Sequence, residues 1–290
     1  MKRVVKSSLL VLGVIVLGVF AFLLTNSISM DRMVDREIKA FISEAESSEI
    51  KTFSYRDLEG LPEPVQRYFR YALQDGQAYI RFAKMEMSAR LRRPNEEKMS
   101  DMTADQYFTT ERPGLLFVAR LHNYPFLGVW VDVRDAYHHG KGKMYVNIVS
   151  GFNVLDERDV KELDHTMFLR FMGQAMICPT ALLPSDYVQW EPVDENSARI
   201  LVANGDNSGT SLVYFDEVGE ITKWVTEGRY EKVGDAYRQV GTIGHHSNYQ
   251  EIDGMKVPTK VVVERVLSDG TREVFLDGEI QGIQFNTFSK

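Results

Sequence analysis

The residues best suited to metal binding in this sequence are its six histidines: His122, His138, His139, His165, His245 and His246. Four of them form two adjacent pairs, and imidazoles from two hairpins, together with Asp132 or Asp135, could complete a metal coordination shell. Because neighbouring residues in a strand point to opposite faces, each pair can easily supply only one ligand. The HExxH spacing is absent. Exposed loop histidines are the commoner outcome, so we predict no metal site and no cofactor. An envelope hydrolase or metal-dependent enzyme that uses the paired histidines remains an alternative.

Nucleophilic chemistry has weak support. Ser208 lies in Gly205–Gly209, which lacks the GxSxG frame of a nucleophile elbow and suits a hairpin turn. Cys178, the single cysteine, precedes Pro179 and is expected to be a small buried thiol. One cysteine cannot form an intramolecular disulfide, and nothing resembles a phosphate-binding glycine loop. We therefore predict no catalytic residues.

A run of methionine and phenylalanine side chains after residue 160 is the feature most suggestive of ligand binding. Methionine packs adaptably, so such a wall can accept variable apolar guests as well as fill an irregular core. Core filling is the simpler interpretation. The alternative is a hydrophobic ligand-binding wall, suited to an acyl chain, made by Met167, Phe168, Phe171, Met172 and Met176.

Trp130, Asp132 and Arg134 lie two residues apart and therefore share one face of a predicted strand. Asp132 and Arg134 are expected to form an ion pair at the surface or rim. The sharper hypothesis is that the three residues form a polar rim that faces the ligand.

The methionine-rich run predicts a helix over residues 159–177. Asp159 followed by Glu162 makes an acceptable capping box at its start, and Cys178 with Pro179 follows its end. A helix with so broad an apolar face cannot stand alone in water. We expect it to lie across the concave side of a sheet.

Most of the remaining chain has the period of two that is typical of half-buried antiparallel strands. In 128–137, Val129, Val131 and Val133 alternate with polar or aromatic residues, and similar runs recur. We count roughly eleven or twelve strands between 78 and 285. The pattern predicts an α+β fold, with one large curved antiparallel sheet (a half-barrel) covered by a central helix.

Two shorter helices are expected before the sheet. Residues 31–46 carry apolar side chains at helical spacing, which predicts an amphipathic helix that serves as a stalk or docks on the domain. A second helix should begin near Pro64, and its buried stripe should comprise Val65, Tyr68, Phe69 and Ala72.

The amino terminus holds a candidate membrane span. Residues 9–24 carry no polar side chain, and 7–25 form a tolerable stretch of about 28 Å as a helix, close to the ~30 Å of a hydrocarbon core. Its length favours an uncleaved anchor, although a cleaved signal peptide also fits. Three basic residues precede the run, so the amino terminus should stay cytoplasmic and residues 30–290 should lie outside the cell membrane: Lys2, Arg3 and Lys6.

The net charge of the chain after the apolar run disfavours one class of partner. Residues 31–290 carry 31 basic and 41 acidic groups, a net charge of −10 that disfavours nucleic acid. We divide the chain into an anchor or signal peptide (1–28), an amphipathic helix with a linker (29–60) and an antiparallel half-barrel domain (61–290). The expected partners are the cell membrane, through residues 7–25, and a lipid or acyl-chain ligand.

Several short motifs together resemble an uncharacterised bacterial family of amino-terminally anchored proteins. These are Leu61–Tyr68, Val133–Tyr137 with Gly140 and Gly142, Pro179–Ser185 followed by Trp190, and Tyr249 with Val257–Thr259. The resemblance spans about 61–285 and implies no assigned activity. By analogy it suggests the half-barrel of LolA/LolB-like lipoprotein carriers, which hold acyl chains in their concavity; such an analogy does not fix function.

The sequence thus favours a membrane-anchored extracytoplasmic protein that binds a hydrophobic or lipid-like ligand without catalysis. Besides the enzyme alternative, a protein-interaction module would be favoured by a large apolar patch on the outer face.

Overall fold

The computed structural model describes residues 2–93, 96–124, 129–149, 151–234 and 236–287. Three helical elements precede the sheet: α1 (Lys2–Ser47), the short 3-10 helix η1 (Tyr55–Leu58) and α2 (Glu63–Ala72). Six strands follow: β1 (Phe82–Arg92), β2 (Met99–Thr109), β3 (Gly114–Tyr124), β4 (Val129–His138), β5 (Lys141–Ile148) and β6 (Phe152–Arg158). The chain then forms α3 (Lys161–Ala175) and the 3-10 helix η3 (Pro179–Leu182). Seven strands complete it: β7 (Val188–Asp194), β8 (Ser197–Asn204), β9 (Asn207–Phe215), β10 (Ile221–Val233), β11 (Ala236–Ile252), β12 (Met255–Val266) and β13 (Arg272–Phe285).

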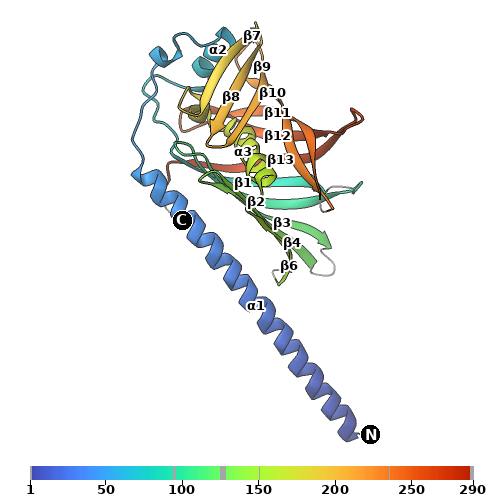
Figure 1. Cartoon of the computed structure of the whole chain (residues 1–290). Coiled ribbons are helices and arrows are strands. Elements are labelled where there is room, and N and C mark those ends of the chain that lie inside the picture. Colours follow the sequence, from blue (N-terminus) through green and yellow to red (C-terminus); the bar gives the residue numbers. More distant parts are fainter. Residues whose placement is uncertain (1, 94–95, 125–128, 150, 235, 288–290) are drawn as a thin grey trace.

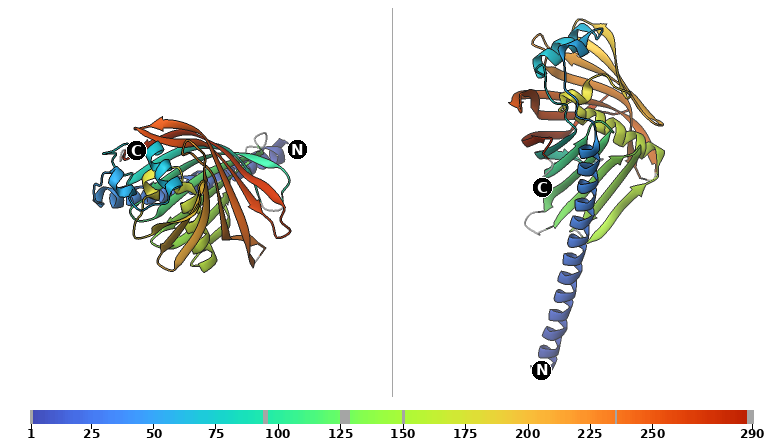
Figure 2. Two further views of the ribbon diagram at one scale, coloured as in Figure 1. Left: turned by 90° about the horizontal axis from the view of Figure 1, so that it is seen from above. Right: turned by 90° about the vertical axis from the view of Figure 1, so that its left-hand side faces the viewer.

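All thirteen strands belong to one antiparallel sheet, in the order β6-β5-β4-β3-β2-β1-β13-β12-β11-β10-β9-β8-β7. Each half is a meander, and the pairing of β1 with β13 joins the two halves. The sheet curls strongly, as the views from the side and from above show (Figures 1 and 2). The predicted curved sheet is therefore confirmed, but the predicted number of strands was too low. The two edge strands, β6 and β7, have mostly exposed side chains and so give little alternation in the sequence.

The strand predicted over 128–137 begins at Val129 in the structure; Gly128 lies outside the described residues. The strand ends in a tight hairpin to β5, in which His139 and Gly140 both have positive φ. This agrees with the two-residue turns that suit the right-handed twist of paired strands.

Helix α3 lies on the concave side of the sheet, as predicted, and contacts β4 and β5 on one side and β9 and β10 on the other. The two halves also meet each other around it. The Tyr137 hydroxyl accepts hydrogen bonds from Asn204 (3.0 Å) and Asn207 (3.2 Å) of the β8–β9 hairpin. Lys232 of β10 donates to Glu157 of β6. The half-barrel is thus wrapped around its own helix.

The predicted start of this helix was wrong. The helix begins at Lys161, its N-cap residue is Val160, and no side chain caps it. Asp159 has a φ of 61°, a left-handed conformation that redirects the chain from β6 and places Asp159 outside the capping position.

Both amino-terminal helices pack on the domain. α1 continues without a break past the apolar run, and its second half lies on the convex face of the sheet (Figure 1). There Ile38 and Phe41 pack with Leu116 and Ala136. In α2, the predicted stripe is confirmed as buried: Val65, Tyr68, Phe69 and Ala72.

Candidate functional site

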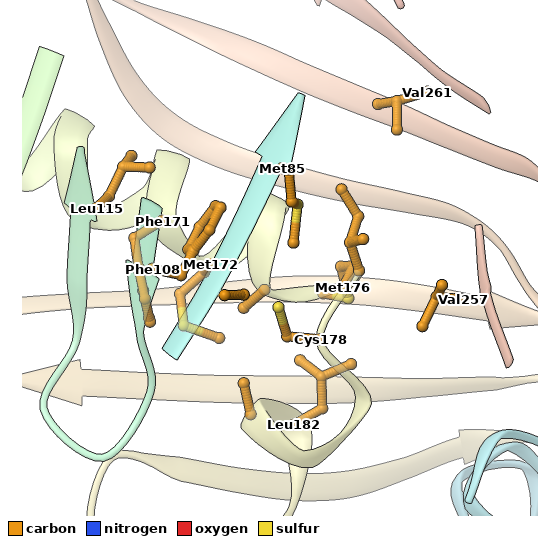
Figure 3. Packing of buried hydrophobic residues seen from close by; sticks show 14 of the residues in the cluster. Met85, Phe108, Leu115, Phe171, Met172, Met176, Cys178, Leu182, Val257 and Val261 are labelled. Atoms are coloured by element: carbon orange, nitrogen blue, oxygen red, sulfur yellow. The ribbon is translucent and has the colours of Figure 1, made fainter. Parts of the chain in front are cut away.

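The concave interior is the candidate site, and its apolar part is built by α3. The predicted wall residues are all buried, with exposed fractions of 0–3%: Met167, Phe168, Phe171, Met172 and Met176. Phe171 packs against Phe108 (Figure 3), with ring centroids 6.2 Å apart. Its ring centroid also lies 6.5 Å from that of Tyr137. Cys178 is also buried, as predicted, and burial raises the pKa of its thiol. Two cavities, one between α1 and β4–β6 and one beside α2, have no lining residue from α3.

The predicted polar rim lies on the opposite, convex face. Asp132 accepts hydrogen bonds from Arg120 (2.7 Å) and from the Trp130 indole (3.0 Å). Arg134 donates two bonds to Glu37 of α1. The expected pair of Asp132 with Arg134 is thus replaced by pairs with other partners, and these residues do not adjoin the methionine-rich wall.

The interior face also carries charge, which the sequence reasoning missed. Interior positions of β1–β5 form one layer across the sheet through cross-strand pairing: Met85, Gln106, Phe117, Asp135 and Met144. Arg170 of α3 reaches this layer, where it pairs with Asp135 and stacks over Phe117 at 4.2 Å. Arg170 therefore introduces a charged side chain between the apolar wall residues of α3.

Four arginines and three carboxylates make up this interior charged cluster: Arg92, Arg170, Arg229 and Arg265 with Asp135, Glu231 and Glu273. Arg265 pairs with Glu231 (3.2 Å) and Glu273 (3.4 Å), and Arg92 pairs with Glu273 (3.1 Å). Arg238, which is about half exposed, also lies 3.9 Å from Glu231. Without Arg238, the cluster carries one more cation than anions.

The surplus cation is Arg229. Among the described residues it has no carboxylate within ion-pair distance, and it stacks over Phe275 at 5.3 Å beside Arg265. Burial and the nearby Arg170 lower the pKa of Arg229 to about 10. The group remains charged at neutral pH, so an incoming anion would compensate a charge that the protein itself leaves unpaired.

Two buried acceptors point to the same region. Gln106 Oε1 and Asp135 Oδ1 accept no hydrogen bond from the described residues, although both side chains are buried. Buried polar atoms are usually hydrogen-bonded, and functional sites are common among the exceptions.

A sequence signal for part of this cluster does exist. Arg265 follows Val261 and Val263 at a spacing of two, so it shares their face, and all three are buried. A charged residue at a strand position where the alternating pattern predicts a buried apolar side chain is therefore informative. Arg229 gives no such signal, because a β-bulge between Thr226 and Arg229 interrupts the register.

The two histidine pairs do not form a common site. His138 and His139 lie with their ring centroids 3.8 Å apart, because the positive φ of His139 turns its side chain toward its neighbour. The expectation that one pair supplies one ligand is therefore wrong here. Glu44 of α1 is 2.7 Å from His138, and these three side chains could hold a metal ion. Within the described residues, no metal-capable group joins them to His245 or His246.

The second pair is split between the two faces of β11. His245 lies 3.7 Å from Glu264, whereas His246 is buried and neither of its ring nitrogens has a hydrogen-bond partner among the described residues. Burial, with a contribution from His245, lowers the pKa of His246 to about 3. His246 is therefore neutral in the folded protein.

Replacing His246 with glutamine is expected to flatten the acid dependence of stability. In the wild type, the unfolded chain binds a proton near pH 6.5 and the folded chain does not, so stability is lost as pH falls from about 6.5 toward 3. Between pH 7 and pH 5 this loss should amount to roughly 2 kcal/mol. Urea unfolding at the two pH values measures it, and an equal loss in His246→Gln would contradict the assignment.

The amino-terminal turn of α3 is held to the β4–β5 hairpin by Asp164. Its carboxylate accepts hydrogen bonds from the Gly142 amide (2.7 Å) and from Lys141 (2.9 Å). Gly142 has room for nothing larger, since a Cβ there would lie 2.6 Å from the Leu163 carbonyl oxygen.

Asp164→Ala is expected to destabilise the protein by about 1–3 kcal/mol, because it leaves the buried Gly142 amide without a partner. Asp164→Asn keeps an acceptor for that amide and should cost clearly less. Denaturant unfolding of both variants separates the hydrogen bond from the exposed pair with Lys141. Equal losses would mean that charge, rather than the amide bond, holds α3 in place.

The model of a family described as "Family of unknown function (DUF6920)" matches residues 59–285. A search of curated proteins finds no match. Among solved structures, the chain is similar to a putative outer membrane lipoprotein-sorting protein domain from Vibrio parahaemolyticus (TM-score 0.41, 10% identity, covering 82% of this chain and 94% of that chain). It is also similar to a DUF1329 family protein from Desulfovibrio piger (TM-score 0.41, 13% identity, 77% and 91% covered). A third similar structure is a beta-barrel-like protein of the domain of unknown function DUF1849 from Brucella abortus (TM-score 0.31, 10% identity, 72% and 100% covered).

Proposed function

The chain belongs to the DUF6920 family, and from its own interior we propose that it is a membrane-anchored extracytoplasmic protein that binds an anionic, lipid-like ligand without catalysing a reaction. The proposal rests on one observation: the methionine- and phenylalanine-rich wall lies near Arg229, which has no carboxylate partner among the described residues. The apolar wall suits an acyl chain, and the arginine suits an acidic headgroup.

The anchor is supported by α1. The described residues contain one helix long and apolar enough to cross a membrane, and that helix continues directly into the part packed on the sheet. Such continuity favours an uncleaved anchor over a signal peptide. The three basic residues that precede the apolar run favour an outward-facing domain. We accordingly assign residues 1–28 to the anchor, 29–60 to the connecting helix and linker, and 61–290 to the ligand-binding domain.

Ligand entry requires α3 to move from the sheet, because its apolar side chains are buried against protein. The helix is suited to such a movement. Arg170 and Asp164 hold it through polar contacts, and the contacts of flexible methionines can be remade with an acyl chain. We therefore propose that α3 occupies the acyl-chain position when no ligand is bound.

The headgroup site is proposed at the interior charged cluster. Its net charge of at least one positive unit would favour a carboxylate or phosphate over a neutral lipid, and Arg229 can donate hydrogen bonds without giving up a carboxylate partner.

A pair of fluorescent probes tests the proposal. A fluorescent fatty acid and its methyl ester have the same chain and differ in charge, so the full-length protein in detergent should bind the acid saturably and at least about tenfold more tightly. Saturable binding of neither probe would refute the proposed function. Equal binding of both would leave an apolar site but remove the role of Arg229.

A further inference from the structure

The tip between β5 and β6 touches α1 at the end of its apolar run. The rings of Phe22 and Phe152 lie 5.9 Å apart. Gly151 is packed so closely that a Cβ there would be 2.7 Å from the Leu23 side chain and 3.2 Å from Phe22. The hairpin therefore reaches the helix within the last apolar turn before Thr25.

The same hairpin exposes large apolar side chains. Phe152 and Val154 are 59% and 56% exposed, and they lie at the start of β6, an edge strand of the sheet. With α1 across a bilayer, the contact to Phe22 sets both residues at the boundary between hydrocarbon and headgroups. Aromatic and aliphatic side chains gain free energy by burial at that depth.

A cavity of about 260 Å³ lies directly beyond this contact, between α1 and the convex face of β4–β6. One face of α1 lines it from Asn26 to Glu37, and the sheet contributes Lys143, Tyr145 and Arg158 among others. The first of these helix residues lies two positions after Leu24, or about 3 Å along the axis. The near end of the cavity is thus at headgroup depth.

The cavity is polar and carries a surplus cation. Arg134 is paired with Glu37, and Arg158 with Asp156 at 2.8 Å. Lys143 is exposed, and among the described residues it has no carboxylate within ion-pair distance. An anionic group that enters would meet one uncompensated ammonium.

We infer that the β5–β6 hairpin is a second membrane contact, in which Phe152 and Val154 enter the outer edge of the bilayer and the cavity beside α1 receives a phospholipid phosphate at Lys143. The inference rests on the anchor in the proposed function. It concerns the convex face and does not involve the interior charged cluster.

Spin labels in the full-length chain test the membrane contact. Cys178 is buried and its raised pKa keeps the thiol unreactive, so a label attaches to an introduced cysteine only. We choose Phe152→Cys at the hairpin, Leu17→Cys in the apolar run, and Val218→Cys, which is 62% exposed beside α2. The protein is placed in vesicles of phosphatidylcholine and phosphatidylglycerol.

The labels at positions 152 and 17 are expected to be relaxed more by oxygen than by a water-soluble nickel complex. The label at position 218 is expected to be relaxed more by the nickel complex than by oxygen. A label at 152 that behaves like the one at 218, with 17 in hydrocarbon, overturns the membrane contact and leaves the anchor intact. A label at 17 that is accessible to nickel overturns the anchor as well.

Native mass spectrometry tests the phosphate site. The detergent-solubilised wild type is expected to retain one phospholipid, and Lys143→Glu should lower that fraction about tenfold or more. Lys39→Glu reverses an exposed charge on α1 outside the cavity and should retain the lipid. Unchanged retention in Lys143→Glu overturns the phosphate site. Binding of the fluorescent fatty acid should be unchanged in this variant, which separates the site from the half-barrel interior.

Discussion

Arg229→Met is expected to weaken binding of the fluorescent fatty acid by roughly 10- to 100-fold and to leave binding of its methyl ester unchanged. The variant removes the one interior cation without an ion pair among the described residues, and a hydrogen bond to a charged group contributes about 1.5–3 kcal/mol. Titration of both probes by fluorescence measures the two affinities. Arg199→Met provides a matched control, because Arg199 is about half exposed and its ion-pair partner, Glu191 at 3.3 Å, lies outside the interior charged cluster.

The same variant should fold more stably than the wild type. The lowered pKa of Arg229 means that the folded protein disfavours its charged form. Because the side chain is partly buried and has no carboxylate partner among the described residues, an apolar side chain of similar length is expected to stabilise by about 1 kcal/mol. Weaker binding together with higher stability is the signature of a residue kept for function. A less stable variant with unchanged affinity would show that Arg229 is structural.

Phe171→Ala is expected to cost about 3–5 kcal/mol of unfolding free energy. The ring is fully buried between Phe108 and Tyr137, and truncation of a buried phenylalanine loses transfer free energy and leaves a cavity. Denaturant unfolding, with the slope held constant, measures the loss. Val218→Ala should change stability by less than about 0.5 kcal/mol, because Val218 is exposed at the surface.

A cost below about 1 kcal/mol in Phe171→Ala would mean that the sheet closes over the truncated side chain or that α3 packs loosely. Added fatty acid should restore part of the lost stability if the acyl chain occupies this region, since a ligand that binds the folded state raises its stability by mass action.

Local periodicity was sufficient to predict the sheet, its curvature and the helix on its concave side. Alternation in Val129, Val131 and Val133 reports two faces, and a helix with an apolar face must cover something. Local periodicity does not indicate which of the two faces of the sheet is concave. Trp130, Asp132 and Arg134 were therefore placed beside the ligand wall in the prediction. They lie on the convex face instead, where Arg134 pairs with Glu37 of α1 and Trp130 donates to Asp132.

The charged interior depends on pairing between residues far apart in the sequence. Arg170 meets Asp135 and Arg265 meets Glu231 only after the two halves of the sheet have curled around α3. A β-bulge sets the register of Arg229, and a bulge moves a side chain to the other face without a reliable sequence mark. The proximity of the His138 and His139 rings depends similarly on one positive φ.

The unbroken course of α1 couples the orientation of the sheet to that of its apolar half. From Leu24 to Ser47 the helix rises about 35 Å without a hinge, and it is fixed to the sheet at Arg134 and at His138. If the helix rotates about its long axis or tilts, the half-barrel moves with it as one rigid body. The half-barrel therefore keeps a constant orientation relative to the apolar half of α1, and it does not reorient independently of that helix.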